Sequence, residues 1–336
     1  MAKQTNSPQT IEKLYVKVPG TSANLGPGFD ILGLALQVYN EFYFEFNETA
    51  QYEMHLLDGS SLPFTVENNL LLQAYKTYYH TFLQSQQIFP YSVKMNLNLP
   101  IKGGLGSSAT ALVAGFCAAS YIHKKFYDFI PFPSEREFLY NLAKLEGHPD
   151  NTTPAFLGGF IFSYFDEEQL IYYKKNLPNS LSLFLFIPEF QTETKGSRKK
   201  LPDKYPTKDI IFNMSRMGTW MQYLETQNYE DLKLAIQDKL HTPYRIDQLP
   251  FLKKVSQIIT DLGYCFSLSG SGPSLLIYCP KESKEIFLRD FKQKLNFFEL
   301  PINYKIIETK ICQEGTIIQE IPTNKLEVNQ KIIQGI

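Results

Sequence analysis

Several features that assign a chain to a specialised class are scarce or absent in these 336 residues. The formal net charge is only −1, which argues against a nucleic-acid partner and gives no signal for binding at a membrane surface. No uninterrupted apolar run is long enough to span a bilayer. Residues 1–12 are polar and lack the apolar segment of a secretory signal, so we expect a cytoplasmic protein without a membrane segment.

Cysteine is also scarce, and no two cysteines form a C-x-x-C pair. The four stand apart within apolar segments, at Cys117, Cys265, Cys279 and Cys312. We interpret them as reduced core residues, which agrees with a cytoplasmic location. Two familiar nucleotide-binding signatures are missing as well. In the glycine-rich segment of the chain no Lys-Ser or Lys-Thr follows the last glycine, and Ala109 stands where G-x-G-x-x-G needs its third glycine.

That glycine-rich segment is nevertheless the most informative one. Residues 93–99 alternate and predict a strand before it, and the apolar residues 109–119 predict a buried helix after it. Free N–H groups at a helix N-terminus, together with glycines that let the backbone approach closely, favour phosphate binding. A plain turn with a serine N-cap is the alternative, but it does not explain three glycines in four positions. The segment reads Pro100-Ile101-Lys102-Gly103-Gly104-Leu105-Gly106-Ser107-Ser108-Ala109.

Strands and helices are expected in both halves of the chain, which predicts an α+β class and, from the length, two domains. Residues 13–18 and 34–46 predict strands, whereas the turn-rich residues 19–29 predict a loop between them. The acidic turn at 166–168 is the expected domain boundary. Further expected elements are the helices 68–84, 134–146, 208–225, 229–238, 251–262 and 281–295 and the strands 160–164, 181–187, 265–268, 275–278 and 303–308.

Three motifs resemble those of the GHMP small-molecule kinases. They are Pro-Gly-Thr-Ser-Ala-Asn-Leu-Gly-Pro-Gly-Phe-Asp at 19–30, Gly-Leu-Gly-Ser-Ser-Ala at 104–109 and Leu-Ser-Gly-Ser-Gly-Pro at 268–273. Any one could arise by chance, but three in order across most of the chain are specific. The resemblance implies ATP and Mg²⁺ as cofactors and a two-domain fold. A ribosomal-protein-like β-α-β ATP-binding domain would span 1–166 and a ferredoxin-like domain 167–336, with the active site between them.

Other segments resemble the homoserine kinases of this family. Residues 22–30 resemble their first motif, and Glu-Gly-His-Pro-Asp-Asn-Thr-Thr-Pro at 146–154 resembles their substrate-side segment, with Thr152 where valine is usual. Residues 194–202 and 243–245 resemble segments that bring a threonine and arginines to the amino acid. The resemblance implies ATP-dependent phosphorylation of L-homoserine to O-phospho-L-homoserine in threonine biosynthesis. It leaves a homodimer open.

The nucleotide and metal sites are likewise implied by resemblance. The resemblance places residues 100–109 and Asn68 at the nucleotide. Capping of the following helix explains either Asn68 or Asn69 equally well. Ser108 and Glu146 match the family's Mg²⁺ ligands, and the adjacent Ser107 is an alternative to Ser108. Without the resemblance, Glu146 would be interpreted as a solvated carboxylate at a helix end.

The implied substrate is a zwitterion with a hydroxyl group. Its carboxylate suits the guanidinium forks of Arg198 and Arg245, and its ammonium group suits Asp30. Taken alone, Arg198 lies in a basic run and would be a solvated surface charge. Taken alone, His148 would be a cap or core residue, and the glycines of the third motif would form a hairpin turn. The remaining implied substrate-binding residues are Asn24, His148, Asn151, Thr194, Gly270 and Gly272.

No general base is implied. Asn151 stands where other GHMP kinases carry an aspartate, and an amide cannot act as a base. The resemblance therefore implies direct attack by the hydroxyl, with Asn151, Glu146 and Ser108 as catalytic residues and the proton passing to a phosphate oxygen or water. Asp150 is adjacent, but its side chain is expected to point elsewhere. The alternatives are a GHMP kinase for another small alcohol, such as mevalonate or a sugar, and a non-catalytic relative that only binds.

Overall fold

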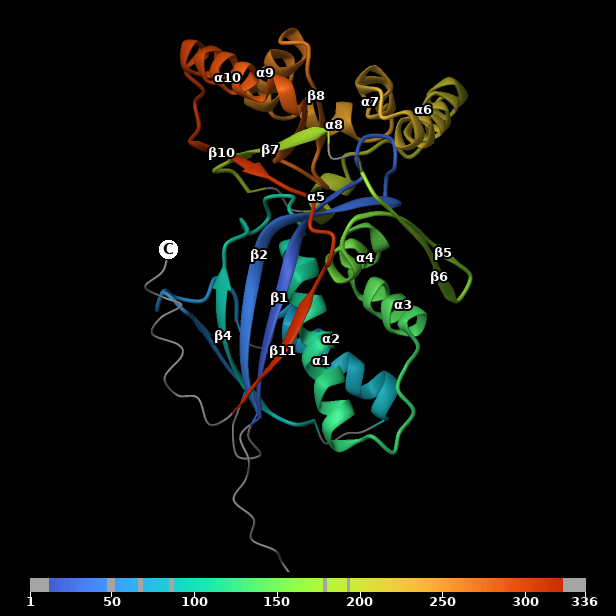
Figure 1. Cartoon of the computed structure of the whole chain (residues 1–336), viewed down its shortest axis with the longest axis vertical. Coiled ribbons are helices and arrows are strands. Elements are labelled where there is room, and N and C mark those ends of the chain that lie inside the picture. Colours follow the sequence, from blue (N-terminus) through green and yellow to red (C-terminus); the bar gives the residue numbers. More distant parts are fainter. Residues whose placement is uncertain are drawn as a thin grey trace, which may run out of the picture.

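A computed structural model describes residues 12–46, 52–65, 69–84, 88–177, 180–191 and 194–322. It contains two β-sheets, one in the lower and one in the upper part of Figure 1, each packed against helices. The order of the first is β11-β1-β2-β4-β3, with β5 joined to β2 and β6 joined to β5, and the order of the second is β10-β7-β9-β8. All strand pairs are antiparallel except β3 and β4. The predicted α+β class is confirmed.

The elements of the first half are β1 (Glu12–Ala23), β2 (Leu32–Phe46), β3 (Glu53–Leu56), α1 (Leu70–Tyr78) with a π-helical turn (Tyr79–Leu83), β4 (Tyr91–Leu97), α2 (Ser107–Phe126), α3 (Glu135–Glu146), α4 (Pro149–Leu157), β5 (Phe160–Asp166) and β6 (Gln169–Lys175). Those of the second half are β7 (Leu181–Pro188), α5 (Thr194–Arg198), α6 (Thr207–Thr226), α7 (Tyr229–Ala235), α8 (Thr242–Ile246), α9 (Pro250–Asp261), β8 (Cys265–Leu268), β9 (Leu275–Pro280), a 3₁₀ turn (Lys281–Ser283), α10 (Lys284–Phe298), β10 (Tyr304–Thr309) and β11 (Ile317–Ile321).

Helix α2 fills the space between the first sheet and helix α1, which explains its almost wholly apolar sequence. A Cβ atom on Gly115 would lie 2.3 Å from the carbonyl oxygen of Leu71, so the glycine lets these two helices approach closely. Helix α3 begins with a capping box, in which Ser134 and Glu137 each accept the other's backbone N–H.

Strand β7 has an apolar sequence because both of its faces are buried. Leu183 and Leu185 face a core cluster with α6 and α7, whereas Phe184 and Phe186 face another with α9 and α10. The cluster that contains Leu183 also holds residues of β2 and β5 from the first sheet. Its Trp220 donates from Nε1 to the carbonyl oxygen of Leu25 at 3.1 Å, so apolar packing and a hydrogen bond join the two halves.

The prediction of a loop over residues 19–29 is corrected in its first part. Strand β1 continues to Ala23 because β2 pairs with it along this stretch, across a register shift between Pro19 and Gly20. Backbone pairing thus overrides the turn-forming composition. The loop begins only at Asn24, which has a φ of 70°.

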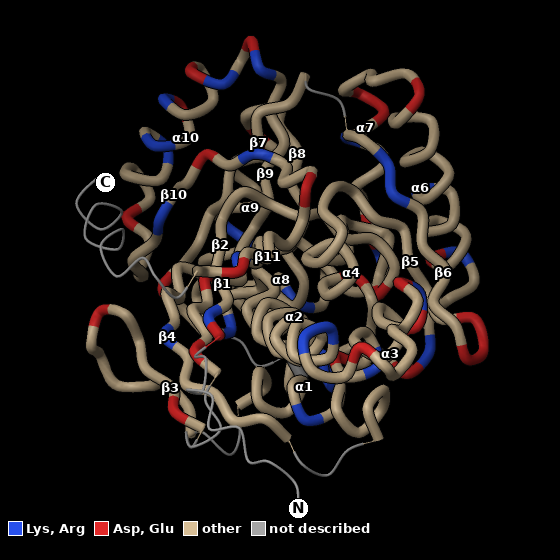
Figure 2. Tube along the Cα trace, turned by 60° about the horizontal axis from the view of Figure 1, so that its bottom comes forward, with Lys and Arg blue, Asp and Glu red and all other residues tan. Residues whose placement is uncertain are grey.

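The expected domain boundary at 166–168 is also corrected. These residues form the turn of a hairpin in which Asp166 pairs with Gln169, so β5 and β6 both belong to the first sheet. The chain crosses to the second sheet after Lys175, and β11 later returns to pair with β1. Figure 2 shows charged residues of both signs interspersed along the trace. Within the described ranges, no helix is both long and apolar enough to cross a bilayer.

Candidate active site

The three predicted motifs meet where the two sheets adjoin. Leu105 accepts a hydrogen bond from the backbone N–H of Thr21 at 3.1 Å, which joins the second motif to the first. The hydroxyl of Ser269 donates to the carbonyl oxygen of Gly104 at 2.7 Å, and the N–H of Gly270 donates to Ala23 at 3.1 Å. The third motif therefore packs beside the glycine loop (residues 103–109).

A cavity of about 360 Å³ opens between the motifs. The predicted residues that line it are Asn24, Asp30, Ile101, Lys102, Gly103, Gly104, Gly106, Ser107, Ser108, Glu146, His148, Asn151, Arg198, Arg245 and Gly270. The predicted residues Pro100, Leu105 and Gly272, which belong to the surrounding loops, and Ala109, which lies in the first turn of α2, do not line it. Leu105 and Ala109 are instead buried in the core. Asn68 and the side chain of Thr194 fall outside what the structure describes.

Helix α2 begins at the glycine loop without a side-chain cap. Its N-cap is Gly106, at a φ of 68°. The alternative of a serine N-cap is wrong, because Ser107 and Ser108 both already lie in the first turn of the helix. The first N–H groups of the helix have no capping side chain, and the helix dipole adds partial positive charge there. This end of the cavity is suited to an anion.

Two glycines of the loop are required by close packing. Gly104 has a φ of 81°, and a Cβ atom on it would lie 2.4 Å from the carbonyl oxygen of Ser269. A Cβ atom on Gly106 would lie 2.1 Å from the hydroxyl of Thr21. The glycines therefore let the three motifs approach one another, a requirement distinct from the predicted approach of the backbone to phosphate.

The cavity has an apolar part next to the glycine loop. It is lined by Phe42, Phe64, Leu70, Leu71, Met95 and Leu97. Asn69 also lines the cavity, and its Oδ1 atom accepts the N–H of Leu71 at 2.7 Å, which makes it the N-cap of α1. The capping alternative is thereby confirmed for Asn69. An apolar wall beside an anion site is suited to a flat heterocyclic ring that carries phosphates.

Ser108 and Glu146, the predicted metal ligands, are in direct contact. The hydroxyl of Ser108 donates to Oε1 of Glu146 at 2.6 Å. Burial raises the pKa of Glu146, and the Ser108 hydrogen bond and the His148 charge act in the opposite direction. Two hard oxygen ligands that converge beside an anion site fit a magnesium ion, which prefers one or two carboxylates together with substrate phosphates.

Charged side chains form the other end of the cavity. Arg198 donates from Nη1 to Oδ2 of Asp30 at 2.8 Å and from Nη2 to Oδ1 at 2.6 Å. Sequence reasoning assigned these two residues to opposite ends of the substrate zwitterion. In the structure they bind each other in a bidentate pair, so each already has a partner of opposite charge.

Arg245 contrasts with Arg198, because it is 6 % exposed and makes no salt bridge with a described residue. Its Nη1 atom donates to the carbonyl oxygen of Gly270 at 2.9 Å, and its buried Nε atom has no partner. Burial, together with the charge of Arg198, lowers the pKa of Arg245 to about 10, so the group is still a cation at neutral pH. A buried cation with an unpaired donor in a cavity wall is suited to an anion.

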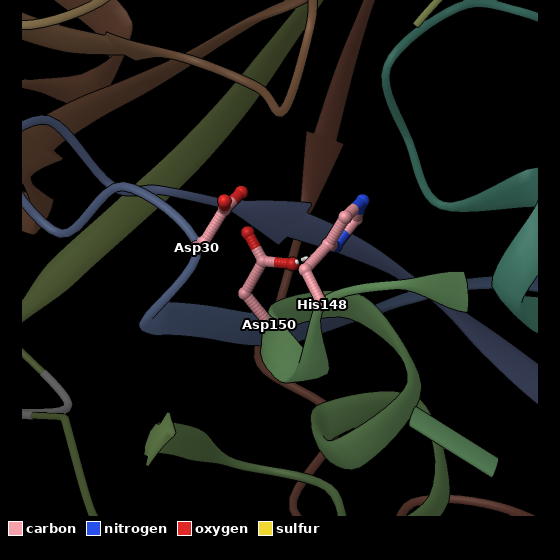
Figure 3. A group of neighbouring side chains, drawn as sticks. All are labelled: Asp30, His148 and Asp150. Carbon is pink, nitrogen blue, oxygen red and sulfur yellow. Dashed lines mark hydrogen bonds and ion pairs between the residues drawn. The ribbon is translucent and has the colours of Figure 1, made fainter. Parts of the chain in front are cut away.

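Asp30, His148 and Asp150 form a compact group (Figure 3), with one potential ligand atom of each within 4.8 Å of the others. His148 Nδ1 lies 2.5 Å from Oδ1 of Asp150. Burial lowers the pKa of His148, but the charges of Asp150, Glu146 and Asp30 outweigh it and raise the pKa to about 9. Protonated imidazole has no lone pair for a metal ion, so this group is not suited to one at neutral pH.

The expected orientation of Asp150 is wrong, because its side chain lines the cavity and is 1 % exposed. Residues 149–157 form helix α4, which was not predicted, and the first turn of this helix directs both Asp150 and Asn151 to the cavity. Oδ2 of Asp150 is buried without a partner. The Oδ1 atom of Asn151 accepts from the hydroxyl of Thr21 at 2.8 Å, which fixes the amide.

Comparisons with known proteins agree with this geometry. Residues 69–159 match the family model of the GHMP kinases N terminal domain. The chain is 36 % identical to the homoserine kinase of Petrotoga mobilis over 90 % of its length and 95 % of the relative, and 35 % identical to that of Caldicellulosiruptor bescii over 94 % and 99 %. The chain belongs to the homoserine kinase family of the GHMP kinases. A crystal structure of homoserine kinase from Cytophaga hutchinsonii has the same fold, with a TM-score of 0.77 at 23 % identity over 95 % of this chain and all of that one.

The sequence argument missed three polar side chains that hold the site of this GHMP kinase in place. Thr21 lies in the first motif but was assigned no contact. Asp238 and His241 lie just before Pro243-Tyr244-Arg245 and are buried behind it. An aspartate three residues before a histidine at a helix start is a local capping signal that could have marked this segment.

Proposed function

We propose that the protein transfers the γ-phosphoryl group of ATP to the side-chain hydroxyl of L-homoserine and forms O-phospho-L-homoserine for threonine biosynthesis. One observation carries the proposal: a single cavity has an uncapped helix N-terminus in a glycine loop at one end and, at the other, a buried arginine that makes no salt bridge with any described residue. A phosphate donor and an anionic small molecule would therefore meet inside it. Phosphoryl transfer needs such positioning more than covalent participation of the protein.

At the nucleotide end, the glycine loop would hold the phosphates through backbone N–H groups, and the apolar wall would contact the base. Ser108 and Glu146 would hold Mg²⁺, which supplies positive charge against the charge of the transferring group. The contact between their oxygen atoms and their position in the wall of the cavity support this assignment.

At the substrate end, Arg245 would bind the carboxylate of homoserine, and Arg198 would add a second charge. Asp30 has both oxygens engaged by Arg198, whereas Oδ2 of Asp150 is buried and unpartnered. We therefore assign the substrate ammonium first to Asp150, with Asp30 beside it. His148 would keep Asp150 in place, and Asn24 would hold the loop of Asp30 through the N–H that it accepts at 3.0 Å.

Asn151 would orient the attacking hydroxyl by donating from its amide nitrogen, because its oxygen already accepts from Thr21. The proton of the hydroxyl would pass to a phosphate oxygen or to water. Such a reaction on a free amino acid is consistent with the expected cytoplasmic location. The homodimer stays a prediction for light scattering to test.

The test is an ADP-release assay with homoserine, mevalonate, galactose and shikimate, each with ATP and Mg²⁺, followed by mass analysis of the product. We expect turnover with homoserine and a mass gain of one phosphoryl group. Protein carrying Glu146→Ala, purified in the same way, controls for a contaminating kinase. Turnover with mevalonate or galactose and none with homoserine would assign the chain to another GHMP activity, and no turnover with any of the four would favour a binding role.

A further inference from the structure

Behind the substrate end lies a buried group of three polar residues, of which only Arg245 has a proposed role in binding homoserine. Asp238 follows helix α7, His241 is the N-cap of helix α8, and Arg245 lies within α8. The side chains of Asp238 and His241 are both 0 % exposed. Charged and titratable groups at such depth are costly unless each has defined partners, so the partners indicate what the group does.

Asp238 is the fixed point of this group. Its carboxylate accepts the backbone N–H groups of Leu240, His241 and Thr242 at 2.8, 3.0 and 2.6 Å, and the side-chain amide of Asn213 at 2.7 Å. The side-chain amide of Asn213 and the backbone N–H groups hold the pKa of Asp238 below its usual value in spite of burial. The carboxylate therefore organises the turn from which α8 starts.

The partners of His241 determine its tautomer. Nε2 lies 2.8 Å from the carbonyl oxygen of Gly26, which can only accept a hydrogen bond. Nδ1 lies 3.3 Å from Nη1 of Arg245, which can only donate one. The hydrogen atom is therefore on Nε2, and Nδ1 presents a lone pair to the arginine. Burial and the charge of Arg245 lower the pKa of His241, which agrees with a neutral ring.

With this tautomer, one of the three side-chain nitrogens of Arg245 has an acceptor for each of its hydrogen atoms. Nη1 carries two hydrogen atoms, and its two acceptors are the carbonyl oxygen of Gly270 and Nδ1 of His241. With Nη1 fixed on two sides, the planar guanidinium cannot rotate without losing a buried contact. Nε stays unpaired, and no described residue accepts from Nη2.

We propose that His241, held by Asp238, is a positioning residue that orients the guanidinium of Arg245 toward the carboxylate of the substrate. This inference rests on the proposed role of Arg245 in binding homoserine. His241 also joins α8 to the first motif through Gly26, so the same ring aligns both loops that border the substrate end. A purely structural role would depend on the Gly26 contact, whereas a positioning role depends on the lone pair at Nδ1.

Two substitutions separate these roles, because each retains one half of the imidazole. His241→Asn places an amide oxygen where Nδ1 was and loses the contact with Gly26. His241→Gln can reach Gly26 with its amide nitrogen and removes the acceptor for Arg245. We expect His241→Gln to raise KM for homoserine roughly tenfold, the range for a lost hydrogen bond to a charged group, with KM for ATP unchanged. We expect His241→Asn to stay within about threefold of the wild type.

A double-mutant cycle with Arg245→Lys distinguishes failure of this inference from failure of the proposed role of Arg245. If Arg245→Lys alone leaves KM for homoserine unchanged, the role of Arg245 is wrong. If Arg245→Lys raises KM for homoserine but His241→Gln does not, His241 does not act through Arg245. The same conclusion follows if the effects of the two substitutions on KM add fully in the double mutant. If KM for homoserine rises in both His241 variants in proportion to their loss of thermal stability, the proposal is also overturned.

A measurement on the unmodified protein covers the case in which these variants do not fold. The ¹⁵N chemical shifts of the His241 ring report its tautomer directly. We expect the neutral Nε2–H form between pH 6 and 8, with the Nδ1 signal changing when homoserine binds. A ring protonated on Nδ1 cannot accept from Arg245, and that result would refute the inference.

Discussion

The two ends of the cavity are built from different parts of the chain. At the nucleotide end, consecutive residues of the glycine loop and the start of α2 supply the backbone groups, Glu146 comes from α3, and other segments supply only the apolar wall. At the substrate end, side chains come from four separate places: the loop before β2, the start of α4, α5 and α8. The first end depends on local backbone conformation, and the second depends on how the whole chain folds.

The two ends also differ in how charge is balanced. The nucleotide end has a helix dipole and one half-buried carboxyl group, whose pKa is raised by desolvation. The substrate end has paired charges, Arg198 with Asp30 and His148 with Asp150, and a buried arginine that pairs with no carboxylate in the described part of the chain. Changes at the nucleotide end should therefore affect the chemical step, and changes at the substrate end should affect the binding of homoserine.

The sharpest test of that division is Glu146→Ala, for which we expect the largest effect. Loss of a metal ligand removes charge that stabilises the transition state, so kcat should fall by about 10²- to 10³-fold, with KM for homoserine little changed. ADP release at saturating Mg²⁺ measures both constants. Glu146→Gln, which keeps an acceptor for Ser108 without the negative charge, is the matched control and should also be slow. A normal kcat in Glu146→Ala would remove the metal role.

The second test concerns the backbone at the nucleotide end. Gly106→Ala should destabilise the fold by about 2–3 kcal/mol more than Gly263→Ala, as measured by urea unfolding. Both glycines have positive φ, at 68° and 85°, but only Gly106 has a neighbour in the way, the hydroxyl of Thr21 at 2.1 Å. Equal destabilisation by the two substitutions would show that left-handed backbone strain, and not packing of the motifs, is what requires the glycine.

The third test compares the two arginines. Arg245→Lys should raise KM for homoserine between about 10- and 100-fold, because a lysine keeps the charge and loses the planar fork. Arg198→Lys should change KM less than about fivefold, because this side chain is 45 % exposed and already paired with Asp30. A larger effect at Arg198 than at Arg245 would reverse the assignment of the substrate carboxylate.

The same difference between the two ends of the cavity explains how much of each end could be predicted from the sequence. The strand, glycine loop and helix of the nucleotide end were predicted because periodicity and glycine spacing are local signals. The substrate residues were found only through resemblance to a family, since no local pattern brings Asp30, His148 and Arg245 together. The partners of their side chains were not predicted at all. Asp30 binds Arg198, and Asp150 points into the cavity because α4 begins at Pro149.

The same limit applies to the fold. The continuous apolar runs of α2 and β7 form the helix and the strand that the sequence predicts, although α2 continues beyond residue 119 to Phe126. Residues 19–23 have turn-forming composition but form a strand, because β2 offers partners for their backbone. Strand β11 was not expected, since it is only five residues long and its position depends on pairing with β1, at least 300 residues earlier in the chain. Long-range pairing of this kind leaves no signal within a short window.

The smallest effect we expect is a pH dependence of stability from His148. Its pKa in the folded protein, about 9, is above the value of about 6.5 in an unfolded chain, so protonation stabilises the fold. This stability is fully present below about pH 6.5 and is lost as the pH rises through 9, with a decrease of about 2 kcal/mol between pH 7 and 9. Urea unfolding without nucleotide or metal measures it, and His148→Gln should flatten the decrease. If the variant loses stability over this range as steeply as the wild type, the charge on His148 does not hold the substrate end together.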